Sequence, residues 1–248
     1  MLKIPNLILS KLCLSLLSGL LLLILNSQLH ARELILATSK SIPPYIVEAN
    51  QSGLQIDIVR RTLEKAGHSI KQTIFTSNKG AEQLLRENKV DAVINAPASL
   101  NDLYISEPVI FYKNIAISLT KNNIQIASVA DLQGLRVMGF QNAHVFLGPA
   151  FERMAADNPS YEESVNQNTQ LTQLYRESID VIVLDQLIFN HFNKHYYFDG
   201  NIPELVKFHD IFPRSPRTLA FLDVGLRDQF NNALKIVLKE MAEEDQAL

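Results

Sequence analysis

Strand-like and helix-like segments alternate along the chain from residue 33 onward, and this order constrains the fold more than any other feature of the sequence. Glu33–Ser39 is an apolar stretch typical of a buried strand. Gly53 opens a segment with apolar residues at helical spacing, and Gly67 stands where a helix C-cap is expected. The next expected elements are a strand, a helix and a strand, at Ser69–Phe75, Lys79–Glu87 and Val90–Asn95. This order predicts a mainly parallel sheet flanked by helices.

A second α/β unit follows the first. Its expected strands are Asn114–Thr120, Leu135–Phe140 and Asp180–Leu184, and its expected helices lie near Leu147–Asp157 and Thr169–Arg176. A strand at Arg217–Leu222 and an amphipathic helix at Gly225–Met241 then lead back to the first unit. We therefore predict an α/β protein of two lobes, each built on a mainly parallel sheet flanked by helices.

The chain is expected to cross between the lobes twice, near Ile115–Lys121 and near Pro213–Leu219, which makes a two-strand hinge. The predicted division is lobe 1 at residues 32–116 plus 217–248, and lobe 2 at residues 117–216. Two lobes joined by a hinge can capture a ligand by closing on it.

The first 31 residues predict a signal peptide. Lys3 and Lys11 precede the apolar run Leu12–Leu25, and Ala31 supplies a small residue for cleavage. An apolar run of about 14 residues suits a signal peptide, whereas a transmembrane helix needs roughly 20. An uncleaved anchor and cleavage after Ser27 remain open alternatives. Export through a cleaved signal peptide places the protein in the periplasm.

Cysteine usage and charge exclude several classes of protein. The single cysteine, Cys13, lies inside the apolar run, so the expected mature chain has no disulfide, cysteine-bound metal or lipid-anchoring cysteine. Loss of Lys3 and Lys11 leaves 21 of the 23 basic residues against 26 acidic ones, a net charge of about −5. We therefore expect no binding to nucleic acid.

Seven short segments, taken in their order along the chain, resemble a known protein family. The segments that carry the resemblance are Pro43–Tyr45, Gly53–Ile58, Val90–Ile94, Ser106–Pro108, Asp131–Val137, Asp180–Asp185 and Leu226–Asn231. They resemble family 3 solute-binding proteins, the type 2 periplasmic binding proteins of polar amino-acid ABC transporters. Gly139–Ala143 and Asn158–Glu163 are similar to a less characterised subgroup, usually described as transporter-like substrate-binding domains.

Tyr45 and Asp185 are the first two candidate ligand-binding residues. In parallel sheets flanked by helices, ligands bind beyond the carboxyl ends of the strands. Asp185 ends an apolar strand there and is placed to pair with an ammonium group. The resemblance implies that Tyr45 stacks on the ligand and that Asp185 holds the α-amino group of an amino acid. Alternatively, Tyr45 is a buried anchor and Asp185 caps the following helix.

Gln141 and Asn142 follow the strand that ends near Phe140, and they precede a helix. Backbone N–H groups at the start of a helix attract anions, and the resemblance implies that this loop meets the ligand carboxylate. Ordinary capping by Asn142 is the alternative. His144, just beyond, is a further residue that a ligand could contact.

The segment Asn95–Tyr104 departs from the family. Amino-acid binders of this family usually carry an arginine there that clamps the α-carboxylate, and this segment has none. Asn95 and Ser99 are the polar candidates that remain. The missing arginine leaves open an amine, a modified amino acid or a different kind of solute.

We expect a monomer that binds a small polar solute, either amino-acid-like or an amine, and that is neither an enzyme nor a cofactor-binding protein. An ABC permease or a membrane sensor is the expected partner. A signalling domain that binds a partner protein through a degenerate cleft is the first alternative. A dehydratase-like enzyme, which could recruit Asp185 and His144, is the second. His191 and His195 stand one helical turn apart without an evident third ligand, so we expect no metal site.

Overall fold

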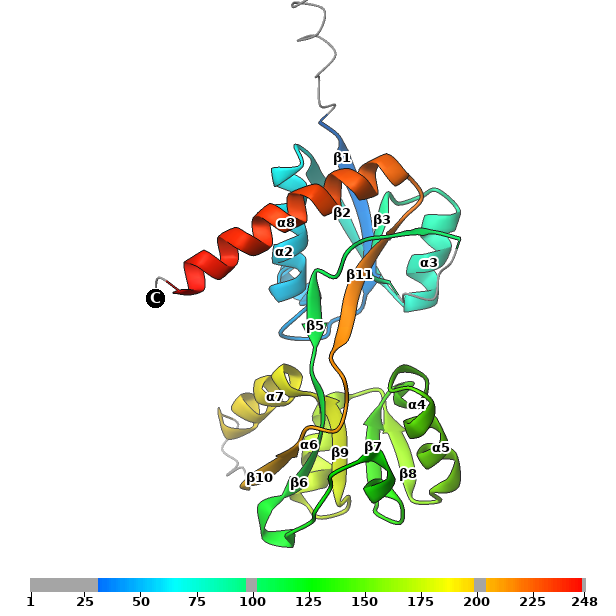
Figure 1. The fold of residues 1–248 in the computed structure, drawn as a ribbon, viewed down its shortest axis with the longest axis vertical. Helices are drawn as coiled ribbons and strands as arrows, with labels where there is room; N and C mark the ends of the chain where they lie inside the picture. Colours follow the sequence, from blue (N-terminus) through cyan, green and yellow to red (C-terminus); the bar gives the residue numbers. More distant parts are fainter. Residues whose placement is uncertain (1–30, 97–101, 199–203, 247–248) are drawn as a thin grey trace, which may run out of the picture.

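The computed structural model describes residues 31–96, 102–198 and 204–246. The strands are β1 (Glu33–Ser39), β2 (Ser69–Thr76), β3 (Ala92–Ala96), β4 (Tyr104–Ile105), β5 (Ile110–Tyr112), β6 (Asn114–Leu119), β7 (Val137–Phe140), β8 (Tyr161–Ser164), β9 (Val181–Asp185), β10 (Val206–His209) and β11 (Ser215–Phe221). The α-helices are α2 (Leu54–Lys65), α3 (Asn78–Arg86), α4 (Ala143–Phe146), α5 (Pro149–Asp157), α6 (Gln167–Tyr175), α7 (Gln186–Phe198) and α8 (Val224–Gln246). They form two α/β lobes, one above the other in Figure 1.

The first lobe is built on a sheet with the strand order β2-β1-β3-β11-β4, and β5 pairs with β11. β1 is parallel to β2 and β3, whereas β11 is antiparallel to β3, β4 and β5. Side chains alternate across β1, so Leu34 and Leu36 pack against α2 and α8 while Ile35 and Ala37 pack against α3. The strand pattern thus buries both faces of this sheet.

The second lobe is built on a sheet with the strand order β10-β6-β9-β7-β8. β7 is parallel to β8 and β9, but β6 is antiparallel to β9 and β10. Ile182 and Leu184 on β9 pack with α6 and α7, and Val181 and Val183 pack on the other face with Phe151 of α5. Both sheets are therefore more mixed than the sequence predicts, because β11 and β6 enter them antiparallel.

Two connections join the lobes, and Figure 1 shows them side by side at the waist of the molecule. β5 pairs with β11 in the first sheet, and β6, which begins two residues later, pairs over its length with β9 in the second. The first crossing is therefore at Lys113, slightly before the expected 115–121, and residues 114–116 belong to the second sheet. The second crossing lies between β10 and β11. The apolar sequence of β6 does not indicate which of the two sheets the strand joins, so the sequence placed the crossing a few residues too late.

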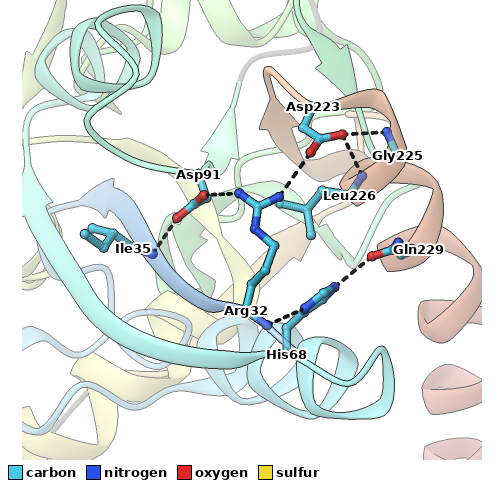
Figure 2. A network of polar contacts seen from close by, with 8 residues as sticks. All are labelled: Arg32, Ile35, His68, Asp91, Asp223, Gly225, Leu226 and Gln229. Carbon is cyan, nitrogen blue, oxygen red and sulfur yellow. Dashed lines mark hydrogen bonds and ion pairs between the residues drawn. The ribbon is translucent and has the colours of Figure 1, made fainter. Parts of the chain in front are cut away.

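Arg32 fixes the start of β1 to three other parts of the first lobe (Figure 2). Its guanidinium contacts Asp91 at 2.9 Å and Asp223 at 3.1 Å. Asp91 also accepts the Ile35 amide at 2.8 Å, so one carboxylate ties the start of β3 to β1. His68 accepts the Arg32 amide through Nδ1 at 3.3 Å and contacts Gln229 of α8 through Nε2 at 2.8 Å.

Within the described ranges, no helix is both long and apolar enough to span a membrane. All but the last residue of the expected signal peptide, 1–31, lies outside the described residues.

Candidate ligand-binding cleft

A cleft of about 740 Å³ lies between the two lobes. The first lobe contributes the segments that follow β1, β2 and β3, and the second contributes those that follow β7, β8 and β9. These are the carboxyl ends of the parallel strands, where ligands of such sheets bind. The volume falls within the range of about 300–1,000 Å³ that is typical of small-molecule sites.

The structure brings most of the predicted site residues to this cleft. Asn95, Gln141, Asn142 and Asp185 line it, although they come from three separate segments of two lobes. Tyr45 lies behind the lining, and Ser99 lies outside the described residues.

Tyr45 is a buried anchor in this structure, with 1% of its surface exposed. Its ring stacks on Tyr112 with the centroids 4.0 Å apart, so Tyr112 is the tyrosine that reaches the cleft lining. Gly53 holds the Tyr45 loop close, because a Cβ on residue 53 would lie 2.4 Å from the Tyr45 carbonyl oxygen. Burial and the nearby Asp185 raise the pKa of the Tyr45 hydroxyl well above its usual range, so it stays a donor.

Asp185 is almost fully buried, with 2% of its surface exposed. Oδ1 accepts from the Tyr45 hydroxyl at 2.9 Å and from the Leu187 and Ile188 amides at 2.9 and 3.1 Å, and Oδ2 accepts from the Lys113 amide at 2.7 Å. Burial raises the pKa of Asp185, and these donors oppose the shift. A carboxylate has about four acceptor sites, two on each oxygen, so Oδ1 is fully used while Oδ2 has the Lys113 amide as its one donor. Asp185 caps α7, as the alternative interpretation holds, and its contact with a ligand stays a prediction.

The loop at Gln141–His144 already holds a carboxylate, which belongs to Glu163 of β8. Glu163 accepts from the Asn142 amide at 2.7 Å, the His144 amide at 3.1 Å, His144 Nδ1 at 2.7 Å and the Tyr161 hydroxyl at 2.7 Å. Partial burial alone would raise the pKa of Glu163, but these donors outweigh it and hold the pKa below its usual range. The amides that the family resemblance assigns to a ligand carboxylate are therefore occupied by a side chain of the protein.

Arg217 lines the cleft but was not predicted from the sequence, and the same holds for Tyr112, Lys40 and Lys79. Arg217 lies on β11 beside Thr218, which pairs with Ala96 at the end of β3, so a guanidinium reaches this edge from the neighbouring strand. Its Cζ lies 4.2 Å from the centre of the Tyr112 ring. The resemblance points to an arginine only in the loop after β3, and the sequence carries no signal that β11 pairs with β3.

No model of a known protein family and no curated protein sequence matches the chain. Several solved structures are similar to the chain in fold. An ancestral arginine-binding protein bound to arginine superposes with a TM-score of 0.64 at 19% identity, covering 88% of this chain and 97% of its own. The arginine-, lysine-, histidine-binding protein ArtJ from Geobacillus stearothermophilus gives 0.61 at 15%, covering 84% and 90%. A histidine kinase sensor domain with similarity to periplasmic binding proteins gives 0.66 at 16%, covering 87% and 94%.

The chain has the fold of the type 2 periplasmic binding proteins. A type 2 periplasmic-binding-protein fold places a cleft between two hinged lobes, and the lining found here follows that plan. Within the described ranges no cluster of three or more His, Cys, Asp or Glu side chains could hold a metal ion. The chemistry that this lining offers is hydrogen bonding and charge pairing.

Proposed function

We propose that this protein binds a small polar solute by closing its two lobes, and that it carries out no chemistry on the solute. The observation that carries the proposal is a cleft lined from both lobes in which buried polar atoms have no partner. Ser39 Oγ, Asn95 Oδ1 and Arg217 Nε make no hydrogen bond within the described part of the chain. Unpaired buried polar atoms are costly, and a bound solute can supply partners.

The hinge supports closure. The lobes are joined by two connections, at Lys113 and between β10 and β11. The hydrogen bond from Tyr45 to Asp185 and the one from the Lys113 amide to Asp185 both lie where the first lobe meets the second. Rotation about these connections would bring the loops of the two lobes together over a ligand.

The two groups that a dehydratase-like enzyme could recruit are both engaged. Asp185 accepts four hydrogen bonds from the protein, and the His144 ring is bonded to Glu163. A general acid or base must be free to reach the proton that it transfers. Their engagement favours binding without catalysis.

The biological setting is part of the same proposal. Export through the expected signal peptide would place the protein in the periplasm, where it would deliver its solute to an ABC permease or present it to a membrane sensor. The likeness to a histidine kinase sensor domain supports a sensing role at the level of the fold. The alternative of a partner-binding domain with a degenerate cleft is favoured by the engagement of Asp185 and of the Asn142 amide.

A solute screen separates these two candidates. Residues 32–248 are heated with panels of amino acids, amines, small peptides and organic acids. A solute at 100 times its dissociation constant stabilises the native state by about 2.7 kcal/mol, which raises Tm by roughly 5–10 °C. A shift with one class of solute supports the receptor. No shift with any class contradicts it and favours the partner-binding domain.

A further inference from the structure

The two family anchor points for an amino acid are filled by the protein itself. Asp185, the expected partner of a ligand ammonium, already accepts four hydrogen bonds. The amides of Asn142 and His144, the expected partners of a ligand carboxylate, already bind Glu163. A ligand carboxylate therefore needs another partner in the cleft, and a ligand ammonium would have to share an Asp185 that already accepts four hydrogen bonds.

The described charges in the cleft lining are three cations and one carboxylate, Asp185, so positive charge is in excess. Lys40 and Lys79 lie in the lining on the first lobe, and neither forms an ion pair with a described residue. Arg217 adds a third positive charge. Among the described residues, Asp185 is the one carboxylate in the lining, and it already accepts four hydrogen bonds. A concave surface with this balance attracts anions and repels cations.

Arg217 is a half-buried cation with room for an anionic partner. Its buried Nε makes no hydrogen bond in the described part of the chain, and the nearby Asp185 attracts it without forming an ion pair. Desolvating a charge without a partner is unfavourable. The stacked Tyr112 ring stabilises the guanidinium and orients its plane, but it offers no oxygen acceptor for the N–H groups. A planar guanidinium matches the two oxygens of a carboxylate.

Two neutral groups in the lining can bind the rest of such a molecule. Ser39 Oγ and Asn95 Oδ1 lack partners among the described residues, and they lie at the carboxyl ends of β1 and β3 in the first lobe. Asn95 also adopts a left-handed backbone conformation, with φ of 64°. Strained residues of this kind concentrate at functional sites.

We propose that the solute is a small carboxylic acid without an ammonium group, and that Arg217 binds its carboxylate. This inference rests on the proposed function. It assigns to β11 the carboxylate-binding arginine that the loop after β3 lacks, and it excludes free amines and ordinary α-amino acids as the preferred solutes.

Matched sets of compounds test the proposal on residues 32–248. Mono- and dicarboxylic acids of three to eight carbons are compared by thermal shift with the α-amino acids and the amines of the same carbon skeleton. The acids should raise Tm while their amino counterparts and the amines should not. Titration calorimetry with the best acid then compares the wild type with Arg217→Gln, Arg217→Lys and Arg153→Gln. Arg153 is an exposed arginine on α5, away from the cleft, and serves as the matched control.

Arg217→Gln should weaken binding of the acid by about ten- to a hundredfold, Arg217→Lys by less, and Arg153→Gln not at all. If Arg217→Gln does not fold, the affinity of Arg217→Lys for the acid is compared with that of the wild type. Lysine keeps the positive charge but lacks the two parallel N–H donors of the guanidinium, so its affinity should be lower. Acids that bind Arg217→Gln as tightly as the wild type overturn the assignment of Arg217. Shifts with amines or amino acids, and none with acids, overturn the inference but leave the proposed function standing. No shift with any compound contradicts both.

Discussion

The Tyr45 hydroxyl donates a hydrogen bond of 2.9 Å to Oδ1 of Asp185, which joins a loop of the first lobe to the end of a strand in the second. Both residues are almost fully buried. The residues that the family resemblance assigns to the ligand therefore bind each other beside the hinge, and their contact holds the two lobes in register.

Tyr45→Phe should lower the free energy of unfolding by about 1–2 kcal/mol, because Asp185 loses one donor in a buried site. Urea denaturation of the mature chain measures this change. Tyr104→Phe is the matched control, since Tyr104 is exposed and its hydroxyl makes no hydrogen bond to a described residue. Equal stabilities of the two variants would show that the bond contributes nothing.

Glu163→Gln should destabilise the protein at neutral pH and have a smaller effect in acid. The folded pKa of Glu163 lies below its usual value of 4.5, so its carboxylate contributes stability above about pH 4.5. That stability is lost as the pH falls through the lowered folded pKa. The free energy of unfolding is measured for the variant and the wild type at pH 7 and at pH 3. The difference between the two proteins should be smaller at pH 3.

Glu162→Gln is the control for this experiment, because Glu162 is the exposed neighbour of Glu163 on β8. A pH-independent effect of Glu163→Gln would contradict the role assigned to its charge.

Asp91→Ala should cost more stability than Arg32→Ala. Removing Asp91 takes away the acceptor of the Ile35 amide as well as the ion pair (Figure 2), for a loss of about 1–2 kcal/mol. Arg32 is 45% exposed, and exposed ion pairs contribute about 0–1 kcal/mol. Thermal unfolding of both variants ranks their stabilities. A less stable Arg32→Ala would contradict the view that the hydrogen bond from the Ile35 amide to Asp91 contributes more than the ion pair.

Lys79→Gln should weaken binding of an organic acid at low ionic strength and leave it nearly unchanged at 0.5 M NaCl. The Lys79 side chain is exposed in the cleft lining, where salt screens its attraction for an anion. The half-buried Arg217 is screened less, so the loss caused by Arg217→Gln should persist at high salt. Calorimetry at the two salt concentrations separates the variants, and identical salt dependence would contradict this division of roles.

The alternation of segments in the sequence was enough to predict the two-lobed α/β fold, which the comparison with solved structures confirms. The expected ranges of β1, α2, β2 and α3 differ from the structure by two residues or fewer at each end. The prediction placed a helix after Asp185, where α7 lies, without giving its range, and it lacked the short strands β4, β5, β8 and β10. Local patterns do not indicate elements that depend on their neighbours for pairing.

The candidate site was predictable only in part. The rule that ligands bind beyond the carboxyl ends of strands led to Asn95, Gln141, Asn142 and Asp185, all of which line the cleft. The partners of these residues could not be predicted, because Glu163 meets Asn142 only through the pairing of β7 with β8.

Arg217 was missed for the same reason. It reaches the end of β3 through the antiparallel pairing of β11 with β3, between residues more than 120 positions apart in the chain. A single sequence does not show which arginine replaces one that is missing from a loop.

A distance measurement between the lobes tests the central claim, capture of a solute by closure. The expected mature chain contains no cysteine, so Gln83→Cys on α3 and Glu152→Cys on α5 can carry a single pair of spin labels. Both helices lie on the right in Figure 1, α3 in the upper lobe and α5 in the lower one. We predict that the acid with the largest thermal shift shortens the distance between the labels. A distance that is unchanged at saturating acid would contradict capture by lobe closure.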